Sequence, residues 1–370
     1  MKKRLSLTAA TIVAAVLMLT GCGTSSGAGG PAASPSGEST SSGAASSRGT
    51  ATTAADTINA LTATGPAQAP TVPDMKPIIK NAKPELPATV TDSTGKTITV
   101  QHANRVIALD LYGTLTDTVI GLGLQDRLVG RGVSDTQQAL QHLPVVSKDG
   151  VDLNTEAVLN LKPDLVLTNM TIGSADNYRQ LEAAGVTVVR FAQSPHLSAI
   201  RGEITQVGAA FGMTKAATRL ADRTDTQLAK AKKTVAALRA ATPDKPRAVV
   251  LYVRGSGGIF FILGADYGAG DVLNFLGLDD VAKDHGITSV KPANAESLVS
   301  LDPQIILTMT DGVKSTGGIA GLLKRPGVAE TTAGRNKRII TAADSQLLSY
   351  GPRTPQSLTA LARAIYTSHP

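Results

Sequence analysis

Apolar runs that alternate with amphipathic stretches make up most of the chain after residue 96. Residues 97–100 and 105–109 are short apolar runs bounded by turn residues, which is typical of strands, and residues 115–124 have the spacing of a helix. The same order of apolar run and helical stretch recurs at 165–168, 178–185 and 186–191. Strands that alternate with helices predict a mainly parallel sheet covered on both faces.

An internal repeat predicts two similar lobes. The segment 154-NTEAVLNLKPDLVLTNM-170 has a counterpart at 294-NAESLVSLDPQIILTMT-310, with Asn, Glu, Leu, Pro, Leu and Thr in register. Each copy has the pattern of a short helix, a turn that contains proline, and a buried strand. We expect an N-terminal lobe at 89–202 and a C-terminal lobe at 243–370.

The region between the lobes, 203–242, is rich in Ala, Leu, Lys, Arg and Gln and contains no proline. From about Lys215 it predicts one helix of about 27 residues, roughly 40 Å long at 1.5 Å per residue. Apolar heptads are not sustained, so a rigid connection is favoured over a coiled coil. The expected fold is α/β, with two three-layer lobes of mainly parallel sheets joined by one long α-helix.

The N-terminus has the pattern of an exported lipoprotein. Three basic residues precede the apolar stretch 5–19, which is too short to span a bilayer, and small residues come directly before Cys22. Cys22 is the only cysteine, so it cannot form an intramolecular disulfide. We predict a signal peptide at 1–21, lipidation of Cys22, and an extracytoplasmic protein anchored to the outer face of the cytoplasmic membrane. An ordinary secretory signal with a chance cysteine is the alternative.

The stretch that follows, 22–88, is dominated by Gly, Ala, Ser, Thr and Pro and lacks a periodic apolar face. Such a composition buries too little apolar surface to offset the entropy of ordering the chain. We therefore predict a disordered tether between the lipid anchor and the first lobe.

Composition argues against several kinds of function. The net charge of +7 over 370 residues includes three basic residues of the predicted signal peptide, which is too weak a bias for nucleic-acid binding. One cysteine without a Cys/His spacing pattern argues against structural zinc. The globular part holds no motif for a nucleophile, a nucleotide or a zinc protease, so we predict that the protein is not an enzyme. A secreted α/β enzyme is the rival interpretation.

Aromatic residues are concentrated in one stretch. The chain has five Phe, six Tyr and no Trp, and four of these lie among several glycines within 251–270: Tyr252, Phe260, Phe261 and Tyr267. Arg254 follows Tyr252 by two positions, so on a strand both side chains point to the same face. A guanidinium beside a phenol favours the ionised phenolate. The aromatic residues are either the core of a strand pair or the walls of a site for a flat ligand.

Three stretches resemble the periplasmic-binding family that serves iron-chelate, heme and cobalamin importers: 105-RVIALDLYGTLTDTVIGLGLQDRLVG-130, 154-NTEAVLNLKPDLVL-167 and 348-LSYGPRTPQSLTALARAIY-366. The resemblance covers nearly all of 89–370. It implies a fold of two α/β lobes with a ligand cleft between them. It also implies that the protein is a substrate-binding lipoprotein, which delivers its ligand to an ABC permease that a cytoplasmic ATPase drives. Residues 251–258 and 318–340 look like those of heme-binding lipoproteins of Gram-positive heme importers, so heme is the implied ligand.

The resemblance also implies roles for the aromatic stretch. In the resembling heme proteins a Tyr at the position of Tyr252 ligates the iron, and an Arg at the position of Arg254 hydrogen-bonds the phenolate oxygen. Phe260, Phe261 and Tyr267 are then expected to supply walls of the ligand site.

One position departs from this pattern. In the related Gram-positive heme binders a His of the N-terminal lobe, within a Gly-His-x-Leu-Asn sequence, often supplies the second axial ligand, and here Val151 stands at that position. Three alternatives stay open: the iron is five-coordinate through Tyr252, the second ligand is His142, Tyr112 or Met170, or the ligand is not heme. A ferric siderophore or cobalamin is the other ligand that the family implies.

The resemblance implies two further roles for charged residues. Glu156 and Glu296 stand at equivalent points of the repeat, and the resemblance implies that each pairs with arginines of the permease. A carboxylate favoured by the dipole of a helix N-terminus fits the same positions. Arg353 is expected on a cleft loop within reach of a ligand carboxylate, and a surface Arg at a helix start is the alternative.

Overall fold

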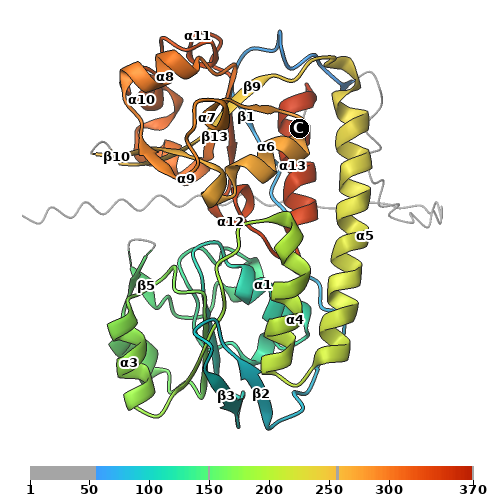
Figure 1. The fold of residues 1–370 in the computed structure, drawn as a ribbon, viewed down its shortest axis with the longest axis vertical. Helices are drawn as coiled ribbons and strands as arrows, with labels where there is room; N and C mark the ends of the chain where they lie inside the picture. The colour runs from blue at the N-terminus through green and yellow to red at the C-terminus, as the bar shows by residue number, and fades with distance from the viewer. Residues whose placement is uncertain (1–55, 149–150, 256–257, 369–370) are drawn as a thin grey trace, which may run out of the picture. The chain divides into compact units, whose positions relative to one another are not determined.

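The structure, a computed structural model, describes residues 56–148, 151–255 and 258–368. Figure 1 shows two lobes built of sheets and helices, with the long helix α5 (Thr214–Leu238) running beside both. α5 packs on α4 (Ile200–Ala210) from one lobe and on α13 (Thr354–Tyr366) from the other. The predicted α/β fold with one long connecting helix is confirmed.

The N-terminal lobe is built on a parallel three-stranded sheet in the order β4-β7-β8. Its strands are β4 (Val106–Leu109), β7 (Leu165–Thr168) and β8 (Thr187–Arg190), and two antiparallel pairs flank them: β2 (Ala88–Thr91) with β3 (Thr97–Val100), and β5 (Ser147–Lys148) with β6 (Asp152–Leu153). The helices are α1 (Thr114–Gly121), α2 (Thr155–Asn160), α3 (Ala175–Ala183) and α4, with 3-10 turns η2 (Gln125–Arg127), η3 (Gln138–Leu140) and η4 (Leu197–Ala199).

The C-terminal lobe has a mixed sheet in the order β1-β14-β13-β9-β10-β12, with β11 beside β9. β10 and β12 are antiparallel to their neighbours, and the other pairs are parallel. The strands are β1 (Ala67–Gln68), β9 (Arg247–Arg254), β10 (Ile259–Leu263), β11 (Asp279–Asp280), β12 (Val290–Pro292), β13 (Ile305–Met309) and β14 (Ile339–Ala342). The helices are α6 (Ala269–Leu276), α7 (Val281–Asp284), α8 (Ala295–Leu301), α9 (Thr310–Ser315), α10 (Gly318–Leu323), α11 (Thr332–Arg335), α12 (Asp344–Leu347) and α13, with 3-10 turns η5 (Arg239–Ala241) after α5 and η6 (Ala265–Tyr267).

Alternate residues of the central strands enter different cores, as a sheet covered on both faces requires. In β4, Val106 and Ala108 belong to a core that residues of both lobes and of α5 share. Ile107 and Leu109 belong to a separate core of the N-terminal lobe. β9 divides in the same way between the shared core and a core of the C-terminal lobe. Because close-packed cores resist deformation, the shared core limits hinge motion between the lobes.

The internal repeat folds as its sequence indicates. Asn154 and Asn294 cap the N-termini of α2 and α8, and each side chain accepts a backbone N–H three residues on. After each helix the chain turns at a proline and enters a central strand, β7 or β13. The repeat is therefore one structural unit present once in each lobe.

The tether prediction is wrong for residues 56–88, which are packed on the lobes. β1 adds a parallel edge strand to β14, and five apolar residues are at most 7% exposed: Ala60, Ala69, Val72, Met75 and Ala88. Composition could not reveal this, because the segment uses sheet edges and backbone acceptors supplied by residues far along the chain. Residues 22–55, with Cys22, and the predicted signal 1–21 lie outside the described residues.

Candidate functional site

A cavity of about 640 Å³ lies between the lobes, within the size range of small-molecule sites. The N-terminal lobe lines it with Leu111, Tyr112, Val133, Ser134 and Thr136, and the C-terminal lobe with Tyr252, Arg254, Ile259, Met309, Asp311 and Asp344. Most of these residues stand at or just after the carboxyl ends of β4, β9, β13 and β14, where parallel sheets bind ligands. We call this space the inter-lobe cavity.

Tyr252 and Arg254 lie on the cavity face at the end of β9. The antiparallel register sets Tyr252 opposite Phe261 and Arg254 opposite Ile259 on β10, and directly opposed residues share a face. The Arg254 guanidinium carbon is 5.0 Å from the centroid of the Tyr252 ring. The structure therefore brings together the phenol and the guanidinium that the sequence pattern singled out.

Asp344, which the sequence analysis did not single out, is the ion-pair partner of Arg254. Nη2 of Arg254 donates to Oδ2 of Asp344, and both residues line the inter-lobe cavity. Burial raises the pKa of the Asp344 carboxyl, and the neighbouring Arg254 opposes that shift. Its position two residues after a buried strand of a parallel sheet was the available signal.

Asp110 positions the N-terminal side of the cavity. Its buried carboxylate accepts backbone N–H groups of Tyr112 and Thr114, each at 3.0 Å, and of Leu115 at 2.7 Å, which fixes the turn between β4 and α1. This turn directs Tyr112 to the cavity. Burial raises the pKa of Tyr112, and neighbouring Tyr252 adds to the shift, so Tyr112 stays a neutral phenol at physiological pH.

Phe260 does not line the inter-lobe cavity, so that prediction is wrong. Strand alternation turns it to the opposite face from Phe261, where it is 5% exposed within the core of the C-terminal lobe and under the guanidinium of Arg325. Phe261 lies opposite Tyr252, packs against the shared core, and is not among the residues that line the cavity either. Tyr267, in η6, is 37% exposed and is not among the residues that line the cavity.

Arg353 is also placed differently from its prediction. Its side chain is buried, and Nε donates at 2.8 Å to Oδ2 of Asp117 in α1. Burial raises the pKa of Asp117 to about 6, and the charge of Arg353 opposes that shift. Arg353 lines a separate pocket beside Arg223 and Gln356 rather than the inter-lobe cavity, so it cannot meet a ligand carboxylate there.

A comparison against protein families identifies the family to which this chain belongs. The family described as periplasmic binding protein matches residues 109–345, more than half of the chain. The chain belongs to the periplasmic binding protein family. Members of this family bind substrates for transport and are not enzymes.

Solved structures and curated proteins give more particular similarities to this periplasmic binding protein. The heme binding protein HmuT is 39% identical, with a TM-score of 0.81 over 84% of this chain and 99% of HmuT. The lipoprotein YvrC of Bacillus subtilis (strain 168), named as an uncharacterized ABC transporter substrate-binding lipoprotein, is 29% identical over 76% of this chain and 86% of YvrC. A cobalamin-binding protein of Halobacterium salinarum is 26% identical over 76% of this chain and 75% of the length of that protein.

Of the residues considered for the second axial position of the periplasmic binding protein, only Tyr112 lines the inter-lobe cavity, and Val151, at the position of the usual His, does not line it either. His142 is exposed beside η3, and Val151, 48% exposed, accepts the backbone N–H of Gly173. Met170 packs against the core of the N-terminal lobe. None of the three is among the lining residues, whereas Tyr112 is. Across residues 56–148, 151–255 and 258–368, no group of three or more His, Cys, Asp or Glu residues is arranged to hold a metal ion.

Glu156 and Glu296 occupy the same place in the two lobes. Each is exposed in the first turn of its helix, two positions after the capping Asn. Their equivalence is therefore structural as well as sequential.

Among the described residues, no helix has both the length and the apolar character that a membrane span requires.

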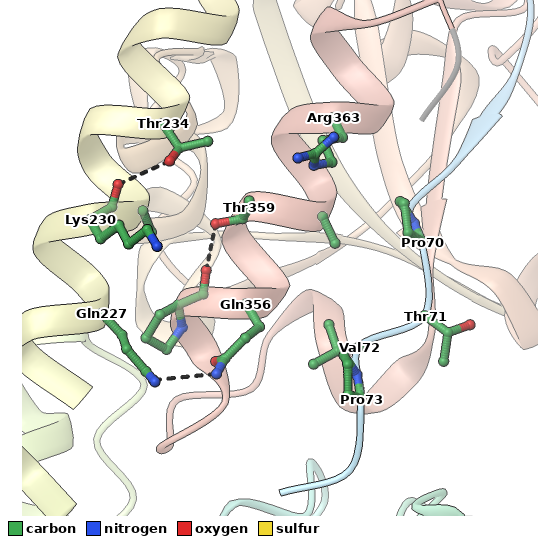
Figure 2. A pocket seen from close by; sticks show the side chains of 13 residues that line it. Pro70, Thr71, Val72, Pro73, Gln227, Lys230, Thr234, Gln356, Thr359 and Arg363 are labelled. Carbon is green, nitrogen blue, oxygen red and sulfur yellow. Dashed lines mark hydrogen bonds between the residues drawn. The ribbon is translucent and has the colours of Figure 1, made fainter. Parts of the chain in front are cut away.

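A second pocket, of about 450 Å³, lies outside the inter-lobe cavity. Figure 2 shows it between α5, α13 and the segment 70–73, where Gln227 of α5 faces Gln356 of α13. It contains neither the tyrosines nor the ion pair of the inter-lobe cavity. The inter-lobe cavity is therefore the better candidate for the transported ligand.

Proposed function

We propose that this periplasmic binding protein is the lipid-anchored, extracytoplasmic substrate-binding protein of an ABC importer, and that it captures heme in the inter-lobe cavity. The observation that carries the proposal is the pair Tyr252 and Arg254 on one strand face of that cavity. Phenolate oxygen is an established axial ligand of heme iron. The Arg254 guanidinium carbon, 5.0 Å from the centroid of the Tyr252 ring, places a positive charge near a phenolate that ferric iron would bind.

Similarity to heme proteins supports this choice of ligand. HmuT has been solved with alanine in place of a tyrosine, of the arginine two positions after that tyrosine, and of a histidine. The tyrosine and arginine have the spacing of Tyr252 and Arg254 in this chain. Heme-binding proteins of lower identity, such as RhuT of Roseiflexus, share the fold as well.

The cavity charge argues against an anionic ferric siderophore. Arg254 is the one cationic side chain among the described lining residues, and the carboxylates of Asp344 and Asp311 stand beside it in the lining. A chelate with negative charge on all sides would meet this carboxylate excess, whereas the two propionates of heme are at one edge of the macrocycle and can stay outside the cavity. Cobalamin is the second candidate, because of the similarity to the cobalamin-binding protein of Halobacterium salinarum.

Heme in this cavity is five-coordinate in our proposal. Of the residues considered for the second axial position, only Tyr112 lines the cavity, and it is a neutral phenol. A neutral phenol is a poor donor to ferric iron, so Tyr112 serves as a wall or hydrogen-bond donor. Phe261, which opposes Tyr252 on the same sheet face, lies beside that ring and does not form a wall of the cavity.

Export and delivery follow from the same family. We propose that Cys22 carries the lipid anchor, as the name lipoprotein for YvrC supports, and that Glu156 and Glu296 dock on the ABC permease that the cytoplasmic ATPase drives. Two exposed carboxylates, one on each lobe, fix the orientation of a rigid body on its partner.

A titration with hemin, followed by visible absorbance, tests the proposal. We expect binding with a ferric phenolate spectrum that Tyr252→Phe abolishes and Arg254→Ala weakens. Tyr112→Phe is the matched control and keeps the spectrum, because that phenol is not the iron ligand. An unchanged hemin affinity and spectrum in Tyr252→Phe refutes the ligation. Cyanocobalamin bound in preference to hemin makes cobalamin the ligand.

A further inference from the structure

Among the described residues, the carboxylate of Asp344 hydrogen-bonds to one side chain, that of Arg254. Nη2 of Arg254 donates to its Oδ2, while Oδ1 is buried without a hydrogen-bond partner among the described residues. The two side chains are 27% and 24% exposed. A charge-assisted hydrogen bond that is largely withdrawn from water is stronger than a surface ion pair, so this contact fixes the guanidinium.

Asp344 reaches Arg254 across an intervening strand. Arg254 ends β9 and Asp344 begins α12 just after β14, and β13 lies between these two strands. Strands two apart are separated by about 10 Å. The Arg254 side chain therefore extends along the edge of the sheet toward Asp344 instead of pointing freely into the cavity.

Helix α9 closes the other side of the guanidinium. A Cβ at Gly312 would lie 2.7 Å from Nη1 of Arg254 and 2.5 Å from the backbone oxygen of Val253. Only glycine allows so close an approach of the helix. Arg254 is thus held between Gly312 and Asp344, beside the Tyr252 ring.

We infer that Asp344 is a positioning residue of the ligand site, which holds the Arg254 guanidinium beside the Tyr252 ring. The inference rests on the proposed role of Tyr252 as the ligand of ferric heme. Arg has many rotamers, and fixing one before binding lowers the entropic cost of forming the site. Asp344 acts through Arg254 and does not itself contact the iron.

A crystal structure of ligand-free Asp344→Ala tests the positioning directly. We expect the Arg254 guanidinium to leave the Tyr252 ring and turn into the cavity. The same structure of Asp311→Asn is the matched control, because Asp311 lines the same cavity but pairs with Lys314. An Arg254 that stays over Tyr252 in Asp344→Ala overturns the inference, whatever the ligand of the protein is.

Hemin affinity in a double-mutant cycle gives the second test. We expect Asp344→Ala to weaken binding about tenfold, the loss of one charge-assisted hydrogen bond, and Asp344→Asn to weaken it less because the amide oxygen still accepts from Arg254. In an Arg254→Ala background, Asp344→Ala should have no further effect. Additive effects of the two substitutions overturn the inference. Failure of the proposed function is distinct from both results, since it shows as unchanged hemin binding in Tyr252→Phe.

Discussion

Arg353 Nε donates a 2.8 Å hydrogen bond to Asp117 Oδ2, and this buried ion pair joins the N-terminus of α13 in one lobe to α1 in the other. Asp117 Oδ1 also accepts from the side chain of Gln137, whose own oxygen accepts the backbone N–H of Met75. The network links both lobes to the N-terminal segment, and it accounts for an arginine that sequence analysis assigned to the ligand.

Removing one member of that pair is expected to be costly. Asp117→Ala leaves a buried guanidinium without its counter-charge and should lower the free energy of unfolding by about 3 to 5 kcal/mol. The double variant Asp117→Ala, Arg353→Met should recover part of that loss, because no unpaired charge remains buried. Urea unfolding of the two single variants and the double variant measures the coupling. Strictly additive losses contradict the account.

The packed N-terminal segment is expected to stabilise the fold. A chain that begins at residue 88 lacks the buried side chains of Val72 and Met75 and the edge strand β1. Its free energy of unfolding should be lower, by about 3 to 6 kcal/mol, than that of a chain that begins at residue 56. Urea unfolding of the two chains side by side checks this, and equal midpoints would show that the segment adds no stability.

Buried Asp135 is expected to make stability fall as pH rises. Burial raises its pKa from 3.8 to about 8, with Asp110 adding to the shift. Between those values the folded state keeps a proton that the unfolded state has released, so the free energy of unfolding decreases with increasing pH. Asp135→Asn should reduce but not abolish the dependence between pH 5 and pH 8, as measured by urea unfolding, because burial also raises the pKa of Glu203 to about 8.

Asp126→Asn is the matched control, because it removes the same charge at an exposed position. It should follow the unsubstituted protein across the pH range. A slope in Asp135→Asn that equals the slope of the control contradicts the assignment of the pH dependence to Asp135.

Substitutions of the two proposed docking residues are expected to lower hemin uptake without changing hemin affinity. Glu156→Lys and Glu296→Lys lie at exposed helix starts away from the cavity lining, so hemin affinity should not change. Hemin uptake by cells should fall strongly, since a reversed charge opposes the permease arginines of the proposed interface. Glu330→Lys, at another exposed carboxylate, is the control for surface charge. Normal uptake in both variants removes the docking proposal.

The elements and the ligand strand could be predicted because their signals are local. Short apolar runs and helical spacing predicted the central strands and α5, and the two-residue interval placed Tyr252 and Arg254 on one face. Alternation also separates Phe260 from Phe261, but which of them shares a sheet face with Tyr252 depends on the register of β10 with β9. That register is not local, so Phe260 was assigned wrongly.

The remaining differences depend on partners far apart in the chain. Arg353 pairs with Asp117, 236 residues away, and Asp344 pairs with Arg254, 90 residues away. Residues 56–88 gain their order from edges and acceptors of both lobes. No short segment of the sequence contains both members of such a pair. Composition and local pattern therefore favoured a tether at 56–88 and an Arg353 available to the ligand.

The most direct test of the central claim is a crystal structure of the protein with hemin bound. We predict heme in the inter-lobe cavity with the Tyr252 phenol oxygen bonded to the iron and Arg254 beside that oxygen. Heme in another pocket, such as the groove between α5 and α13 (Figure 2), or heme in the cavity with the iron bonded to a different residue, would contradict the account.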